Sequence, residues 1–196
     1  MNTVTSTTLL DALLQADDSD GWKHFHERYW PMIVAFARKQ GLADNDAEDV
    51  GQETVMAFVQ SYGKGGFDRG KGRLRSWLFG IASHKCIDVL RRLMRENVVC
   101  PETSGTCFLD RIPSADEMKK TWTAAWQQGV LKACLQEVAQ EVQPKTYQAF
   151  DLYVLQNWSV EDVARKLGMT ENAVYIAKNR VLSRARELLP RMEEIW

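Results

Sequence analysis

Residues 159–174 read SVEDVARKLGMTENAV. Within this stretch Ala164 is small enough for another helix to pack closely against it, and Gly168, four residues later, permits the left-handed backbone conformation of a tight turn. Val174, six residues further on, can anchor a second helix in a core. This spacing is typical of two helices joined by a short turn, the helix-turn-helix unit.

Both helices of this unit have start signals. Ser159 followed by Asp162 is a capping box, in which a hydroxyl and a carboxylate satisfy free backbone amides at a helix start. Thr170 can cap the second helix in the same way. We therefore expect one helix to begin after Ser159 and the other after Thr170.

In units of this kind the second helix enters the major groove of DNA. At 100° per residue its inner stripe consists of Val174, Ala177, Val181, Ala185 and Leu188, and its outer face of Asn172, Tyr175, Ile176, Asn179, Ser183 and Arg186. An asparagine can read adenine, and an exposed isoleucine can contact a thymine methyl group. The basic residues expected to hold phosphates are Arg165, Lys178, Arg180 and Arg184. A helical hairpin that binds no DNA remains the alternative.

Helical periodicity also dominates the rest of the chain. Apolar residues at three- and four-residue steps predict helices over about 9–14, 20–41, 44–63 and 73–96, followed by one around 122–138 and another from Pro144. Pro31 is expected to kink or break the second of these. Between 97 and 115 the periodicity fails, and prolines, serine and glycine indicate a linker.

We therefore predict an all-α fold of two helical domains joined by a flexible linker, with the helix-turn-helix in the C-terminal domain. The predicted ranges are 1–96 for the first domain, 97–118 for the linker and 119–196 for the second domain.

The charge is distributed unevenly, although the net charge of the whole chain is only −1. Residues 64–95 contain nine basic and two acidic side chains, a net +7, and residues 164–196 contain seven and four, a net +3. The segments before each block are acidic. Two basic blocks in acidic surroundings indicate two separate polyanion contacts, and solvated helix faces are the alternative reading.

Other classes of function find no support in the sequence. It has no catalytic triad, no phosphate-binding loop with its Lys-Ser/Thr ending and no metal-ligand spacing among its cysteines and histidines, so we predict a protein that is not an enzyme and uses no metal or cofactor. It also has no apolar run long enough to span a membrane and no secretion signal. We therefore predict a cytoplasmic location.

Two further segments carry a family resemblance. Residues 46–54, DAEDVGQET, and residues 75–92, RSWLFGIASHKCIDVLRR, resemble the second conserved region of extracytoplasmic-function (ECF) sigma factors of the sigma-70 family. The helix-turn-helix resembles the part of these proteins that reads the −35 promoter element. The blocks and the linker also occur in the order that the family has.

The resemblance implies that the chain binds core RNA polymerase and promoter DNA and directs transcription initiation, and it allows an anti-sigma factor as a further partner. The residues expected to bind polymerase are Asp49, Gln52 and Glu53. Those expected at the −10 element are Lys71, Arg73, Arg75, Trp77, Lys85, Arg91 and Arg92, and those at the −35 element are Arg165, Asn172, Tyr175, Ile176, Lys178, Asn179, Arg180 and Arg184. Trp77 has a core role as its alternative, and acidity at a helix start is the alternative for the polymerase set.

The sequence departs from the family at one informative place. Family members often carry a lysine or arginine just after the valine of the recognition helix, where this chain has Tyr175 and Ile176. Two other readings stay open: a helix-turn-helix regulator that acts without polymerase, and a helical interaction module whose basic faces only contact solvent. The first leaves residues 46–53 unexplained, and the second leaves the spacing from Ala164 to Val174 to chance.

Overall fold

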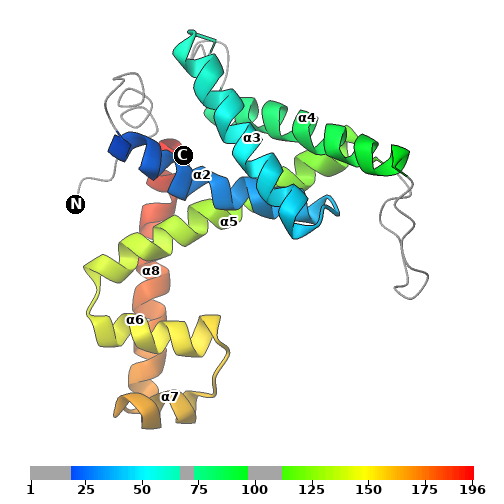
Figure 1. Ribbon diagram of the computed structural model, residues 1–196. Helices are drawn as coiled ribbons and strands as arrows, with labels where there is room; N and C mark the ends of the chain where they lie inside the picture. The colour runs from blue at the N-terminus through cyan, green and yellow to red at the C-terminus, as the bar shows by residue number, and fades with distance from the viewer. Residues whose placement is uncertain (1–18, 67–72, 97–111) are drawn as a thin grey trace, which may run out of the picture. The chain divides into compact units, whose positions relative to one another are not determined.

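The computed structural model describes residues 19–66, 73–96 and 112–196. Every regular element in these ranges is helical, which confirms the predicted all-α fold (Figure 1). The elements are α2 (Ser19–Lys39), α3 (Asp44–Gly63), α4 (Leu74–Arg95), α5 (Ala115–Glu141), α6 (Pro144–Phe150), the π-helical turn η2 (Asp151–Leu155), α7 (Val160–Leu167) and α8 (Glu171–Ile195). Within the described ranges, no helix combines the length and apolar character that crossing a membrane requires. The helix predicted near 9–14 lies outside these ranges, as does the linker up to residue 111.

The chain forms two compact units, one reaching to Gly129 and including Trp196, the other comprising Val130–Ile195. The division falls inside α5, because the first half of that helix packs on aromatic residues of the first unit. The ring centroids of Phe36 and Trp122 are 5.3 Å apart, and those of Tyr29 and Trp126 are 5.8 Å apart. The domain ranges 1–96 and 119–196, which were placed around the linker, stay a prediction.

The core of the first unit lies between α2, α3 and α4. The apolar stripe of α2 is fully buried, with Phe25, Tyr29, Ile33 and Phe36 at 0% exposure. Pro31 does not break α2, which continues to Lys39. Gly51 of α3 lets the first two helices approach closely, because a Cβ atom there would lie 2.7 Å from Cγ2 of Val34.

The second unit is built around α8. Its predicted inner stripe is confirmed, since Val174, Ala177, Val181, Ala185 and Leu188 are all buried. Val174 and Ala177 form a core cluster with Ala149, Leu152 and Val163, on which Ala164 and Leu167 pack. Figure 1 shows α7 beside the first turns of α8.

The turn between α7 and α8 has the local geometry expected from the sequence. Ser159 accepts a hydrogen bond from the backbone N–H of Asp162 at 3.1 Å, Gly168 has φ of 57°, and Thr170 accepts from the N–H of Ala173 at 3.2 Å. The capping box differs from the expected one in one bond. The Asp162 carboxylate was expected to accept from a free backbone amide, and in the structure it accepts from the Ser159 hydroxyl at 2.8 Å.

Candidate nucleic-acid and partner interfaces

The acidic residues of α3 form the first candidate interface. Asp49, Gln52 and Glu53 are all exposed, as binding to a partner requires. The helix begins with Asp44 and Asp46 in its first turn, where negative charge is favourable against the helix dipole. Asp49 and Gln52 line a surface pocket of about 440 Å³, and Glu53 lies outside its lining.

The other walls of this pocket were not predicted from the sequence. His26 and Trp30 of α2 contribute a stacked pair of rings, with centroids 5.3 Å apart, and Met56 of α3 is 51% exposed beside them. A spacing of four residues indicates that His26 and Trp30 share a helix face. It does not indicate that this face borders α3, since that depends on how the two helices pack.

Basic residues of α4 form ion pairs with the acidic residues of α3. Nζ of Lys85 lies 2.8 Å from Oε2 of Glu53, and Nη2 of Arg92 lies 2.6 Å from Oδ1 of Asp46. The structure therefore brings a predicted polymerase-binding residue and a predicted −10 residue into direct contact. These side chains are partly exposed, so each pair contributes only about 0.2–1 kcal/mol and can open when a partner competes.

The remaining predicted −10 residues have mixed surroundings. Arg73 is exposed at the start of α4, and Arg91 lies 4.0 Å from Asp88 on the same helix. The Arg75 guanidinium lies 5.6 Å from the centroid of the Trp126 ring.

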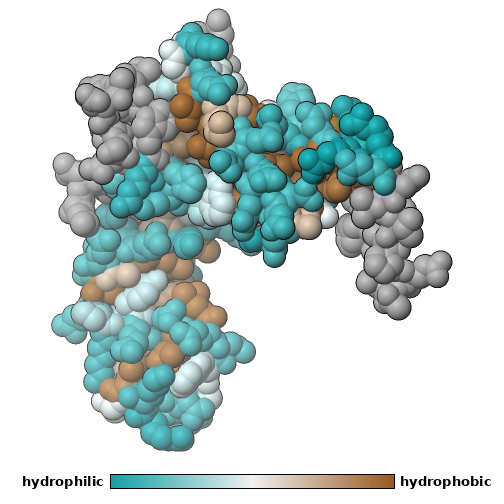
Figure 2. Space-filling model, viewed as in Figure 1, coloured by the Kyte–Doolittle hydropathy of each residue, from teal (hydrophilic) through white to brown (hydrophobic). Residues whose placement is uncertain are grey.

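Trp77 contacts buried Phe58 edge-on, with ring centroids 5.1 Å apart, which agrees with the alternative core role of Trp77. Lys71 lies outside the described residues. Hydrophilic residues cover the C-terminal end of α4 in Figure 2.

The outer face of α8 is the second candidate interface. Its predicted outward residues, Asn172, Tyr175, Ile176, Asn179, Ser183 and Arg186, are all exposed, and so is Arg180. Ile176 is 51% exposed, so packing in the core of this unit does not account for an apolar side chain at this position. Figure 2 shows hydrophobic patches among the hydrophilic surface of the second unit. Arg165 pairs with Asp162, its neighbour on α7, at 3.1 Å.

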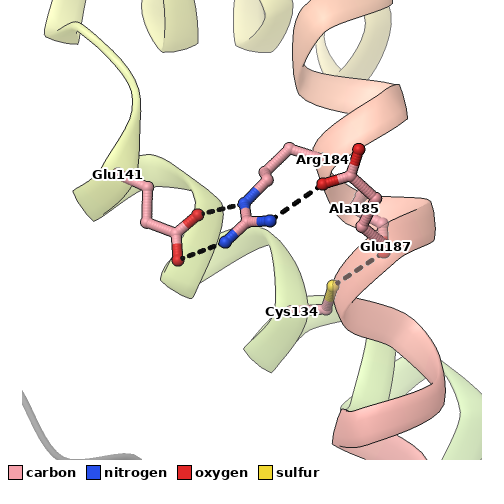
Figure 3. A network of polar contacts seen from close by, with 5 residues as sticks. All are labelled: Cys134, Glu141, Arg184, Ala185 and Glu187. Carbon is pink, nitrogen blue, oxygen red and sulfur yellow. Dashed lines mark hydrogen bonds and ion pairs between the residues drawn. The ribbon is translucent and has the colours of Figure 1, made fainter.

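Arg184 points away from this face and toward α5. Its Nε and Nη2 atoms donate to the two carboxylate oxygens of Glu141, and Nη1 donates to Glu187 at 2.8 Å (Figure 3). These hydrogen bonds raise the pKa of Arg184 and lower the pKa of Glu141. The sequence could not locate Glu141 as a partner, because it lies 43 residues away. A phosphate contact by Arg184, which stays a prediction, would have to displace these carboxylates.

The Glu141–Arg184 contact predicts a specific pH dependence. The pKa of Glu141 is lower in the folded chain than its ordinary value of 4.5, so this pair stabilises the fold above that pH and the contribution is lost as the pH falls through the folded pKa. We expect the midpoint of acid unfolding to shift to higher pH in Glu141→Gln, and the difference in stability from the wild type to shrink as the pH falls below 4.5. The control is Gln140→Ala, which changes an exposed neutral side chain on the same turn. An equal shift in both variants would contradict the assignment.

Two cysteines lie among buried residues. Burial raises the pKa of Cys86 to about 12, so its thiol stays protonated at neutral pH. Cys134 is also buried, and its thiol donates to the carbonyl oxygen of Ala185 at 3.4 Å (Figure 3). Both therefore behave as small core residues.

Comparison with known proteins finds similarity to sigma factors. The family model of sigma-70 region 2 matches residues 25–96, which include the pocket, the acidic face of α3 and the whole of α4. The chain is 27% identical over 194 residues to the ECF RNA polymerase sigma factor SigD of Mycobacterium tuberculosis, with 91% of this chain and 82% of that protein covered.

Two further relatives cover most of the chain. ECF RNA polymerase sigma factor SigM of Mycobacterium tuberculosis is 28% identical over 178 residues, covering 90% of this chain and 79% of that protein. RNA polymerase sigma factor CarQ of Myxococcus xanthus is 24% identical over 174 residues, covering 89% of this chain and 92% of that protein. Residues 25–96 thus match sigma-70 region 2, and along both compact units the chain is similar to ECF sigma factors of the sigma-70 family.

Proposed function

We propose that this chain is an ECF-type sigma factor, which binds core RNA polymerase, recognises promoter DNA and directs transcription initiation without catalysing a reaction itself. The observation that carries the proposal is the match to sigma-70 region 2, because it covers both the acidic face of α3 and the basic helix α4. Cytoplasmic location follows from the polymerase as partner. An anti-sigma factor is a further partner class for proteins of this group.

In this proposal α3 is the polymerase-docking helix. Asp49 and Gln52 are exposed at a pocket whose aromatic and thioether walls offer apolar contact beside carboxylates. Such a combination suits a partner that presents both basic and apolar side chains, because charge complementarity steers association and buried apolar anchors provide affinity.

Promoter contact is assigned to α4 and α8. Lys85, Arg91 and Arg92 of α4 would hold the nucleic-acid backbone near the −10 element. Asn172, Tyr175, Ile176 and Asn179 of α8 would read the −35 element, with Arg180 on a phosphate. Because polymerase supplies part of the affinity, we expect the isolated protein to bind promoter DNA weakly.

The test is to mix the purified chain with core RNA polymerase, isolate the complex and use it for run-off transcription on a pool of genomic fragments. Binding followed by selective initiation would support the proposal and reveal the promoter sequence. DNA binding without polymerase binding would favour a conventional helix-turn-helix regulator. If the free chain, verified to contain no bound anti-sigma factor, binds neither, the helical interaction module becomes the better reading.

A further inference from the structure

Tyr153 lies outside the helix-turn-helix but contacts its second helix. It belongs to η2, the π-helical turn that continues α6, and it packs on the core cluster of Ala149, Leu152, Val163, Val174 and Ala177. Its position is therefore fixed by the core, while one side of its ring meets the surface of α8.

Two side chains of α8 meet this ring. Tyr175 contacts Tyr153 edge-on, with ring centroids 5.7 Å apart and ring planes at 89°. Nζ of Lys178, three residues further along α8, lies 5.6 Å from the centroid of the Tyr153 ring. The Tyr153 phenol also raises the pKa of Tyr175, through its charge and a hydrogen bond.

The two side chains that Tyr153 contacts have different expected roles. Tyr175, 42% exposed, is a predicted base reader, and Lys178 is a predicted phosphate contact. A base contact depends on accurate placement, and a side chain already held in place loses less conformational entropy on binding. A ring anchored in the core can thus restrict both side chains before DNA arrives.

We propose that Tyr153 is a positioning residue for the −35 element: its ring holds Tyr175 and Lys178 in place on α8 and thereby determines how strongly the holoenzyme discriminates among −35 sequences. The inference rests on the proposed function and adds a specificity-determining residue from outside the helix-turn-helix. Tyr153 itself need not touch DNA.

The test uses reconstituted holoenzyme and measures run-off transcription from the cognate promoter and from promoters with single −35 base-pair changes. The variants are Tyr153→Leu, which keeps an apolar side chain without the ring, Tyr153→Phe, which keeps the ring without the hydroxyl, and Tyr175→Ala. We expect Tyr153→Leu to lower the ratio of cognate to altered transcription about fivefold at the positions affected by Tyr175→Ala. The Phe variant should retain most of the discrimination. Tyr153→Leu combined with Tyr175→Ala should lose no more discrimination than Tyr175→Ala alone.

Three outcomes separate the possibilities. A wild-type holoenzyme that shows no −35 preference would refute the proposed reading of α8 itself. A wild-type preference that Tyr153→Leu leaves unchanged, or a uniform loss on all promoters, would overturn the inference alone. If Tyr153→Leu unfolds, Tyr153→Met takes its place, because its longer apolar side chain fills the core without providing a ring. Unchanged −35 discrimination in that variant would also overturn the inference.

Discussion

Phe58→Ala is expected to lower the free energy of unfolding of the first unit by about 3–5 kcal/mol, the usual cost of removing a fully buried aromatic side chain. Phe58 has 0% exposure and stacks on Phe25, with ring centroids 4.5 Å apart. It also contacts Tyr62 at 5.6 Å and Trp77 at 5.1 Å. One ring therefore joins α2, α3 and α4, and its loss leaves a cavity where the three helices meet.

Thermal unfolding followed by circular dichroism measures this effect, and the midpoint should fall by about 12 °C or more for a unit of this size. Met56→Ala, two residues earlier on the same helix and 51% exposed, is the matched control and should change stability by about 0.5 kcal/mol or less. Similar stabilities for the two variants would show that Phe58 is not part of the core.

Gln52→Ala is expected to weaken binding to core polymerase by about 10- to 30-fold, the effect of losing an interface residue worth about 1.4–2 kcal/mol. Gln52 is exposed on α3 at the pocket that Trp30 and Asp49 also line, so its removal should not disturb the core. Fluorescence anisotropy with labelled protein and unlabelled core polymerase gives the affinity directly.

Gln60→Ala is the control for this measurement, because Gln60 is exposed on the same helix outside the pocket lining. Arg180→Ala is the reciprocal variant: transcription from cognate promoters should fall while polymerase affinity stays unchanged. Normal polymerase affinity in Gln52→Ala would refute the docking assignment. Loss of polymerase affinity in Arg180→Ala would refute the separation of polymerase and −35 contacts between α3 and α8.

The all-α class and the faces of α8 were predictable from the sequence, because both depend on local periodicity. The inner stripe from Val174 to Leu188 is buried and the outer residues are exposed, as 100° per residue requires. The turn at Gly168 was predictable for the same reason, since a left-handed φ favours glycine whatever the surroundings. Helix starts at Ser159 and Thr170 likewise depend on neighbours within three residues.

The pairing of charged groups was not predictable, because it depends on distances between helices. Arg184 has the sequence position of a phosphate contact, and only packing of α8 on α5 brings it to Glu141. Lys85 and Glu53 belong to blocks assigned to different partners and meet because α3 and α4 lie side by side.

The sequence by itself therefore determined the helices, their apolar faces and the residues available for binding, since each follows from spacing within a few turns. The tertiary structure alone decided which of those residues act together: Trp30 with Gln52 at the pocket, Trp122 with Phe36 in the first unit, and Tyr153 with Tyr175 in the second. Periodicity specifies which face of a helix is buried, whereas the identity of the neighbouring helix depends on how the whole set of apolar faces packs.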